Sequence, residues 1–257
     1  MIKFDGQTFL VTGASRGIGA AAARVLLAAG ANVVGSYANA PGAMETLIQE
    51  FGADRILAIR SDLSEIGAGF QLWKDAMAFK GTLDGLVNNA GVAPETEHTA
   101  DQAIWHADWA TVMAVNVQAV ADLSKSAIEH FQNCRAHDQD YRGRIVTIAS
   151  RAAFRGDQSN SLHYAASKGA VVAMTRSIAR AFASEGILAY LIAPGWVKTD
   201  MAAVAYAPGN EHMLKEIPIG DTAPPEELGN MIAFLLSGLV DHATGATFDI
   251  NGASYVR

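Results

Sequence analysis

This 257-residue sequence has one cysteine and lacks long apolar runs and a leader-like N-terminus. Its single cysteine, Cys134, cannot form a disulfide within the chain, which is typical of proteins from reducing compartments. No apolar run approaches the roughly 20 residues that a membrane-spanning helix needs. Residues 1–13 lack the uninterrupted apolar core of a signal peptide. We therefore expect a soluble cytoplasmic protein with no membrane partner.

Positive charge is also scarce. Lysine and arginine number 19 against 26 aspartates and glutamates, which gives a net charge of −7. A duplex-binding protein needs a basic surface to neutralise phosphates, so we expect no nucleic-acid partner. We also expect no metal site. His130, Cys134 and His137 have a suggestive spacing, but there is no obvious fourth ligand and no H-E-x-x-H motif.

Apolar strand-like runs alternate with longer segments of helical spacing along the whole chain. We expect strands at 8–12, 32–36, 55–60, 83–88, 144–150, 187–193 and 247–250. Helices are expected at 18–29, 41–51, 66–79, 108–133, 162–184 and 225–237. This alternation indicates βαβ units and a parallel sheet buried on both faces. It predicts one domain over 1–257, an α/β doubly wound Rossmann-type sheet of about seven strands with helices on both faces.

Two segments fit neither helix nor strand. Residues 132–143 are polar, and we expect an exposed loop there. Residues 200–218 mix Ala, Met, Tyr, Pro and Gly after a strand end. Such a segment is expected to form a mobile cover over a site.

The unusual residues gather at the ends of the predicted strands. Ligands of open parallel sheets bind beyond the carboxyl ends of the strands, where the strand order reverses. The polar, glycine-rich and proline-containing segments expected at this edge are 13–19, Tyr37, Asp62, 88–91, Ser150 and 194–199. The predicted edge is therefore the candidate site.

Residues 12–19, TGASRGIG, lie between a predicted strand and a predicted helix. Glycines there let the backbone approach a pyrophosphate, which then rests on the helix N-terminus. The spacing G-x-x-x-G-x-G differs from the commoner G-x-G-x-x-G. An ordinary strand–helix turn is the alternative, but the other strand ends beside it favour a dinucleotide site.

The end of the second strand bears on which dinucleotide binds. An acidic residue about 20 positions past the glycines would bind the ribose hydroxyls of NAD, but residues 35–39, GSYAN, contain no carboxylate. Arg16 could pair with the extra phosphate of NADP. A solvated Arg16 is the alternative, because no second basic residue stands at 36–39. The sequence favours NADP(H), and NAD(H) is possible.

Tyr164 and Lys168 lie four positions apart near the start of a predicted helix, so they share a face. A phenol with a pKa near about 10 is poorly matched to proton transfer at neutral pH. Lowering that pKa by about 3 units needs roughly 4 kcal/mol, and one ammonium about 4 Å away supplies an amount of this order. We expect Lys168 to lower the pKa of Tyr164 beside Ser150. A capping cluster with a surface lysine is the alternative.

Together these motifs resemble the short-chain dehydrogenase/reductase family, and the resemblance covers essentially the whole chain. It is closest in appearance to 3-oxoacyl-(acyl-carrier-protein) reductases. The matching motifs are TGASRGIG at 12–19, Asp62-Leu63, NNAG at 88–91, Asn116, Ser150, YAASK at 164–168 and PGWVKT at 194–199. The resemblance implies an NADP(H)-dependent oxidoreductase that reduces a ketone, 3-oxoacyl or similar, to a secondary alcohol.

The resemblance also implies a role for each matching position. Tyr164 is the acid/base, Ser150 holds the substrate oxygen, and Lys168 binds the nicotinamide ribose and tunes Tyr164. Asn116 anchors a water in a proton relay to Lys168. The implied cofactor-binding residues are Gly13, Ser15, Arg16, Gly17, Ile18, Gly19, Ser36, Tyr37, Asp62, Leu63, Asn89, Ala90, Gly91, Tyr164, Lys168, Pro194, Gly195, Val197 and Thr199. A homotetramer, or a dimer, packed through two long helices and the C-terminal strand region is implied as well.

The chain departs from this pattern in three places. Asp221 stands where many acyl reductases carry Arg, which puts an acyl-carrier partner in doubt. Ser150 and Tyr164 are one residue further apart than in many members, and the polar segment 132–143 is longer. Two other functions stay open: an NAD-dependent dehydrogenase of a sugar, steroid or other secondary alcohol, and a non-catalytic cofactor-binding regulator.

Side chains near the predicted site are candidates for substrate contact. Arg151 and Arg155 flank it and could attract an acidic substrate or a phosphopantetheine carrier; solvated side chains are the alternative. We expect the pocket walls to include Phe154, His163, Trp196 and Met201. Trp105 and Trp109 are expected to serve in packing or subunit contact.

Overall fold

The computed structural model describes residues 2–207 and 209–257, without the side chains at 201, 204, 205 and 211. The described residues form one parallel seven-stranded sheet with the order β3-β2-β1-β4-β5-β6-β7. The strands are β1 Thr8–Val11, β2 Asn32–Tyr37, β3 Ile56–Arg60, β4 Gly85–Asn88, β5 Gly143–Ile148, β6 Ile187–Pro194 and β7 Thr247–Ile250. The strand order reverses between β1 and β4, so the predicted doubly wound α/β sheet is confirmed.

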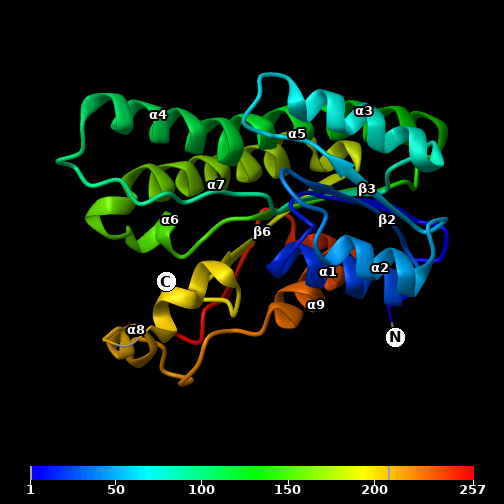
Figure 1. The fold of residues 1–257 in the computed structure, drawn as a ribbon. Coiled ribbons are helices and arrows are strands. Elements are labelled where there is room, and N and C mark those ends of the chain that lie inside the picture. The colour runs from blue at the N-terminus through cyan, green and yellow to red at the C-terminus, as the bar shows by residue number, and fades with distance from the viewer. Residues whose placement is uncertain (1, 208) are drawn as a thin grey trace.

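Helices cover both faces of the sheet (Figure 1). One face carries α1 Gly17–Ala28, α2 Ala43–Phe51 and α9 Pro225–Leu236. The other carries α3 Ala68–Lys80, α4 Gln102–Met113, α5 Ala119–His137 and α7 Leu162–Phe182. Two short helices, α6 Ala152–Arg155 and α8 Glu211–Lys215, follow β5 and β6.

The apolar core lies in two layers because successive strand residues point to opposite faces. Phe9 belongs to the cluster that contains Leu26 of α1 and Ile232 of α9. Its neighbour Leu10 belongs to the cluster with Leu123 of α5. All eight residues of β6 are buried, as expected of a central strand of a parallel sheet.

The predicted helix 108–133 is wrong at both ends. Helix α4 begins at Gln102, a π-helical turn spans Ala114–Gln118, and α5 continues to His137. The apolar spacing shifts across the π-helical turn, so a 3.6-residue pattern cannot follow both helices. Trp105 and Trp109 therefore lie inside α4 rather than before it.

The predicted loop 132–143 is wrong over its first half, because α5 continues to His137 and β5 begins at Gly143. Polar side chains such as Gln132 and Arg135 suit the exposed face of a helix as well as a loop. The predicted cover 200–218 includes position 208, which lies outside the described residues. It contains a 3-10 helix, Asp200–Tyr206, and α8.

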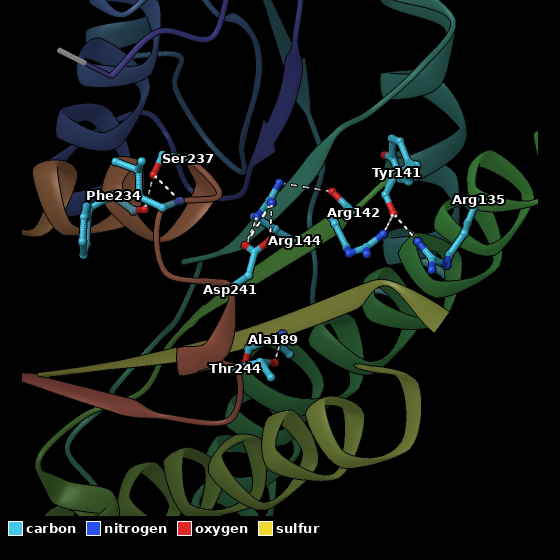
Figure 2. Close-up of polar contacts among 10 residues, drawn as sticks. Arg135, Tyr141, Arg142, Arg144, Ala189, Phe234, Ser237, Asp241 and Thr244 are labelled. Carbon is cyan, nitrogen blue, oxygen red and sulfur yellow. Dashed lines mark hydrogen bonds and ion pairs between the residues drawn. The ribbon is translucent and has the colours of Figure 1, made fainter. Parts of the chain in front are cut away.

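Side chains at the amino-terminal edge of the sheet bind one another (Figure 2). In β5, Arg144 donates from Nε to Oδ1 of Asp241 at 3.0 Å and from Nη2 to Oδ2 at 3.0 Å. Thr244 accepts a hydrogen bond from the Ala189 N–H at 3.0 Å. These contacts tie the segment after α9 to β5 and β6. No helix within 2–207 or 209–257 has the length and apolar character that crossing a membrane requires.

Candidate active site

The glycine segment between β1 and α1 packs tightly against the segment after β4. A Cβ at Gly13, whose φ is +66°, would lie 3.0 Å from the Ala90 Cα, and one at Gly19 would lie 2.2 Å from the Gly13 oxygen. Helix α1 begins at Gly17 with no acidic residue in its first turn and no side-chain cap. Its first N–H groups therefore point at a place suited to an anion.

Thr12 holds this arrangement together, and sequence reasoning assigned it no role. Its hydroxyl oxygen accepts hydrogen bonds from the Asn89 N–H at 2.9 Å and the Ala90 N–H at 3.0 Å. The Asn89 side chain donates to the Thr12 carbonyl at 2.8 Å. The available signal was a hydroxyl placed at the end of a buried strand, where such a group needs a partner.

The ends of β2 and β3 present fewer free groups than the resemblance implies. Ser36 is buried and accepts a hydrogen bond from the Gly13 N–H at 3.3 Å. Leu63 packs in the core. Asp62 accepts hydrogen bonds from the Ser64 hydroxyl and N–H, which lower the pKa of Asp62. Of these three, Asp62 is the one with a polar side chain near the surface of this edge.

Two arginines lie near the β2 end. Arg16 forms an ion pair with Asp200 at 3.1 Å, and both side chains are 77% exposed. Arg60 pairs with Tyr37 in the sheet register, and its Nε donates to the Ala38 carbonyl at 3.0 Å. The sequence analysis considered basic residues at positions 36–39 only, so it did not predict Arg60. The neighbouring strand supplies this cation.

Lys168 and Asn116 meet at Gly91, and the Tyr164 ring lies beside Lys168. A Cβ at Gly91 would lie 3.4 Å from the Lys168 Nζ and 3.3 Å from the Asn116 Oδ1. The Lys168 ammonium donates to the Ile148 carbonyl at 2.8 Å and lies 5.8 Å from the centre of the Tyr164 ring. Burial lowers the pKa of Lys168 to about 8. The structure thus brings the predicted catalytic residues to one place.

The structure does not show the expected lowering of the Tyr164 pKa by Lys168. Burial raises the pKa of the Tyr164 phenol, and a hydrogen bond with Ser150 opposes that rise. Burial favours the neutral form of an acid. The ammonium of Lys168 is itself desolvated and directed at a backbone carbonyl, so the loss of water dominates the pKa of Tyr164.

Asn116 lies in the π-helical turn, and its side chain is fully engaged. Its Nδ2 donates to the Val92 carbonyl and to the Ser167 hydroxyl, both at 3.0 Å, while its Oδ1 accepts from the Val92 N–H at 2.9 Å. The side chain therefore joins the segment after β4 to α7.

A buried polar chain behind Tyr164 was missed by the sequence reasoning. His163 is 1% exposed. Its Nδ1 accepts from the Tyr164 N–H at 2.8 Å, and its Nε2 lies 3.0 Å from the Thr96 hydroxyl. Thr96 donates to Asp108 Oδ2 at 2.6 Å. The chain connects α4, the segment after β4 and the start of α7, and it fixes the backbone that carries Tyr164.

The predicted pocket walls are only partly supported. His163 lies beneath the site in the chain just described. Phe154 contacts the C-terminal segment, with its ring 3.8 Å from the Arg257 Cζ and 6.5 Å from the Tyr255 ring. Trp196 lies beside Arg151, 5.9 Å from its Cζ. The Met201 side chain lies outside the described residues.

Residues 194–199 face the glycine segment from the other side. A Cβ at Gly17 would lie 2.9 Å from the Thr199 Cγ2, and one at Gly195 would lie 2.8 Å from the Asn251 Cβ. Val197 is buried, and the Pro194 carbonyl accepts from the Arg151 N–H at 3.0 Å. These contacts pack the segment against the start of α1 and the end of β7.

Trp105 and Trp109 pack together in α4 with ring centres 5.8 Å apart. This agrees with the expected packing role. His130 and Cys134 contact each other, with Nε2 and Sγ 3.5 Å apart. Within the described part of the chain, no group of three potential metal ligands gathers.

Comparison with known proteins gives a match over nearly the full length. A family model described as Enoyl-(Acyl carrier protein) reductase matches residues 13–253. The 3-oxoacyl-(acyl-carrier-protein) reductase FabG of Escherichia coli is 33% identical over 264 residues, covering 99% of this chain and 100% of that protein.

Solved structures of other proteins have the same fold. A 3-ketoacyl-(acyl-carrier-protein) reductase from Brucella melitensis complexed with NADH has a TM-score of 0.86 at 27% identity, covering 98% of this chain and 99% of that one. A putative 2-deoxy-d-gluconate 3-dehydrogenase from Agrobacterium tumefaciens with bound NADP has a TM-score of 0.87 at 30% identity, covering 99% and 98%.

Proposed function

The chain belongs to the short-chain dehydrogenase/reductase family, and from this premise we propose that it reduces a ketone, 3-oxoacyl or similar, to a secondary alcohol with NADP(H). The observation that carries the proposal is that Lys168 meets Asn116 at Gly91, next to the glycine segment, and has the Tyr164 ring beside it. The similar proteins described above include 3-oxoacyl reductases and proteins with NADP or NADH bound.

The start of α1 and the segments packed beside it fit a dinucleotide. The crowding around Gly13 and Gly19 leaves bare backbone at the start of α1, where a pyrophosphate is bound without side-chain obstruction. Arg16 and Arg60 are the cations that would meet a 2′-phosphate, and Asp62 would meet the adenine. The same backbone accepts NAD(H), which lacks that phosphate. When bound, the nicotinamide supplies the hydride.

The protein's own groups then handle the proton. Because burial raises the pKa of Tyr164, its phenol stays protonated at neutral pH and is ready to donate to a carbonyl oxygen. Ser150 holds that oxygen beside the phenol. Lys168, when charged, stabilises the phenolate left behind. A protonated phenol favours the reductive direction.

We also propose that residues 1–257 act as one catalytic domain and assemble into a homotetramer or a dimer. Two features support assembly. Strand β7 has a neighbour on one side only, β6. A groove of about 580 Å³ runs beside it, lined by residues of α9 such as Met231 and Phe234 and by the end of β7. Light scattering coupled to gel filtration measures the assembly.

A kinetic screen tests the proposed reaction. Ketones and secondary alcohols, including sugars and steroids, are offered with NADPH, NADH and their oxidised forms. We expect NADPH oxidation with ketones, faster than with NADH. A strong NAD preference with alcohols would establish the dehydrogenase alternative. Indifference to the whole panel, with cofactor still bound, would establish the non-catalytic regulator.

A further inference from the structure

Arg151, the residue after Ser150, is a buried cation without a bound anion. It is 5% exposed, and its Nη1 has no hydrogen-bond partner among the described residues. Burial lowers the pKa of its guanidinium, and Arg155 acts in the same direction. Among the described side chains, which do not include Glu211, no carboxylate forms an ion pair with it.

The carboxylates nearest to Arg151 are exposed. Asp157 and Glu216 influence the guanidinium electrostatically from a distance, Asp157 from the segment after α6 and Glu216 from the end of the 200–218 segment. Neither reaches it. A buried charge without a partner is strongly unfavourable, so its persistence points to an anion that arrives from outside.

The guanidinium lies beside residues 194–199, which border the candidate site. The Arg151 N–H donates to the Pro194 carbonyl at 3.0 Å, and its Cζ lies 5.9 Å from the centre of the Trp196 ring. The side chain therefore lies between the Ser150 turn and residues 194–199. Trp196 supports one side of the planar group, as aromatic rings support arginine elsewhere.

We propose that Arg151 binds the carboxylate of the substrate, so that the ketone reduced here carries a free carboxylate. This rests on the function proposed above and adds the substrate class. A carboxylate matches the planar guanidinium with two parallel hydrogen bonds. It also neutralises a single buried cation, whereas a phosphate dianion leaves one charge buried and unpaired.

Matched acids and esters test the proposal. The probes are 3-oxobutanoate, 4-oxopentanoate and 5-oxohexanoate, each beside its methyl ester, because the reach from Ser150 to the guanidinium selects the chain length. In the wild type, at least one acid exceeds its ester in kcat/KM by about 30-fold or more, mainly through KM. Equal values for all three pairs would overturn the proposal.

Three variants assign the preference to Arg151. Arg151→Gln removes the acid-over-ester preference, and Arg151→Lys keeps part of it because the charge stays and the planar fork is lost. Arg155→Gln is the matched control, since Arg155 is exposed; it changes the ratio less than about 3-fold. An unchanged ratio in Arg151→Gln would contradict the assignment.

Binding separates this inference from the proposed reaction. Calorimetry on the Tyr164→Phe variant with NADPH measures affinity for each acid and ester without turnover. Selective binding of an acid that the wild type does not reduce supports Arg151 and removes the reductase function. Reduction of acids and esters at equal rates supports the reductase function and removes the role of Arg151 in binding a carboxylate. Tighter binding of dihydroxyacetone phosphate than of every acid would show a phosphate site instead and overturn the carboxylate.

Discussion

Two arginines at opposite edges of the same sheet differ in their partners. Arg144, at the amino-terminal edge, is 14% exposed and holds Asp241 through two hydrogen bonds (Figure 2). Arg151, beyond the carboxyl end of the same strand, is more deeply buried and has no partner for Nη1 among the described residues. Both guanidinium groups are largely buried, but among the described side chains Arg144 has a carboxylate partner and Arg151 has none.

The difference distinguishes a paired cation that stabilises the fold from an unpaired cation that can bind a ligand. Polar groups that satisfy one another stabilise the fold, whereas unpaired buried cations destabilise it until a ligand arrives. Lys168 is similar to Arg151, because it is a buried cation whose hydrogen bond is to a neutral carbonyl. The two buried cations of the carboxyl edge, Lys168 and Arg151, are therefore available to ligands.

Breaking the Arg144 pair should have the largest effect on stability. Arg144→Gln leaves Asp241 without its partner, so we expect the free energy of unfolding to fall by about 3 kcal/mol. Arg151→Gln should change it by less than about 1 kcal/mol, or raise it. Urea unfolding of both variants checks the contrast. The double variant with Asp241→Asn isolates the pair's own contribution, and equal losses from Arg144→Gln and Arg151→Gln would contradict the comparison.

Lys168 should give a smaller, pH-dependent effect. Burial lowers its pKa to about 8 on folding, from an ordinary value of 10.5. Between those values the unfolded chain binds more protons than the folded one, so the stability of the cofactor-free protein rises with pH. From about pH 7 to about pH 10 this contribution is about 2 kcal/mol. We expect the difference between wild type and Lys168→Met to follow it, and parallel curves would refute the assignment.

Thr96 tests the polar chain behind Tyr164. Thr96→Val removes the hydroxyl between His163 and Asp108, so we expect a loss of about 1–2 kcal/mol in stability and a several-fold lower kcat with KM little changed. Thr111→Val is the control, because the exposed Thr111 hydroxyl bonds only the Ala107 carbonyl. A control as damaging as Thr96→Val would show that the chain has no special role.

The exposed Arg16–Asp200 pair should matter least for stability. Arg16→Gln is expected to change the free energy of unfolding by less than about 0.5 kcal/mol, because exposed ion pairs contribute little. NADPH binding should weaken about 10-fold relative to NADH, since one cation facing the 2′-phosphate is lost. Fluorescence titration with both cofactors measures this ratio. An unchanged ratio would leave Arg60 as the phosphate-binding residue.

The sequence predicted the sheet and its ligand edge because both follow from local periodicity. Each strand is a short apolar run, and glycine marks the tight contact at Gly13 and Gly19. The expected helix 108–133 crosses the π-helical turn but stops short of Gln102 and His137, because polarity alone does not distinguish an exposed helix from a loop.

Partners distant in sequence could not be predicted. Arg60 reaches the β2 end because β3 pairs with β2, and Thr96 meets Asp108 and His163 through tertiary packing. The sequence placed Arg151 near the site but left a solvated side chain open; its burial depends on the packing of residues 194–199. The direction of the Tyr164 pKa shift likewise depends on burial.

The most direct test of the account is the rate of NADPH oxidation by Tyr164→Phe with the best ketone found for the wild type. The loss of the proton donor should lower kcat by about 10³-fold, while the affinity for NADPH stays within about 3-fold. A Tyr164→Phe enzyme that turns over at the wild-type rate would contradict the central claim that this phenol delivers the proton.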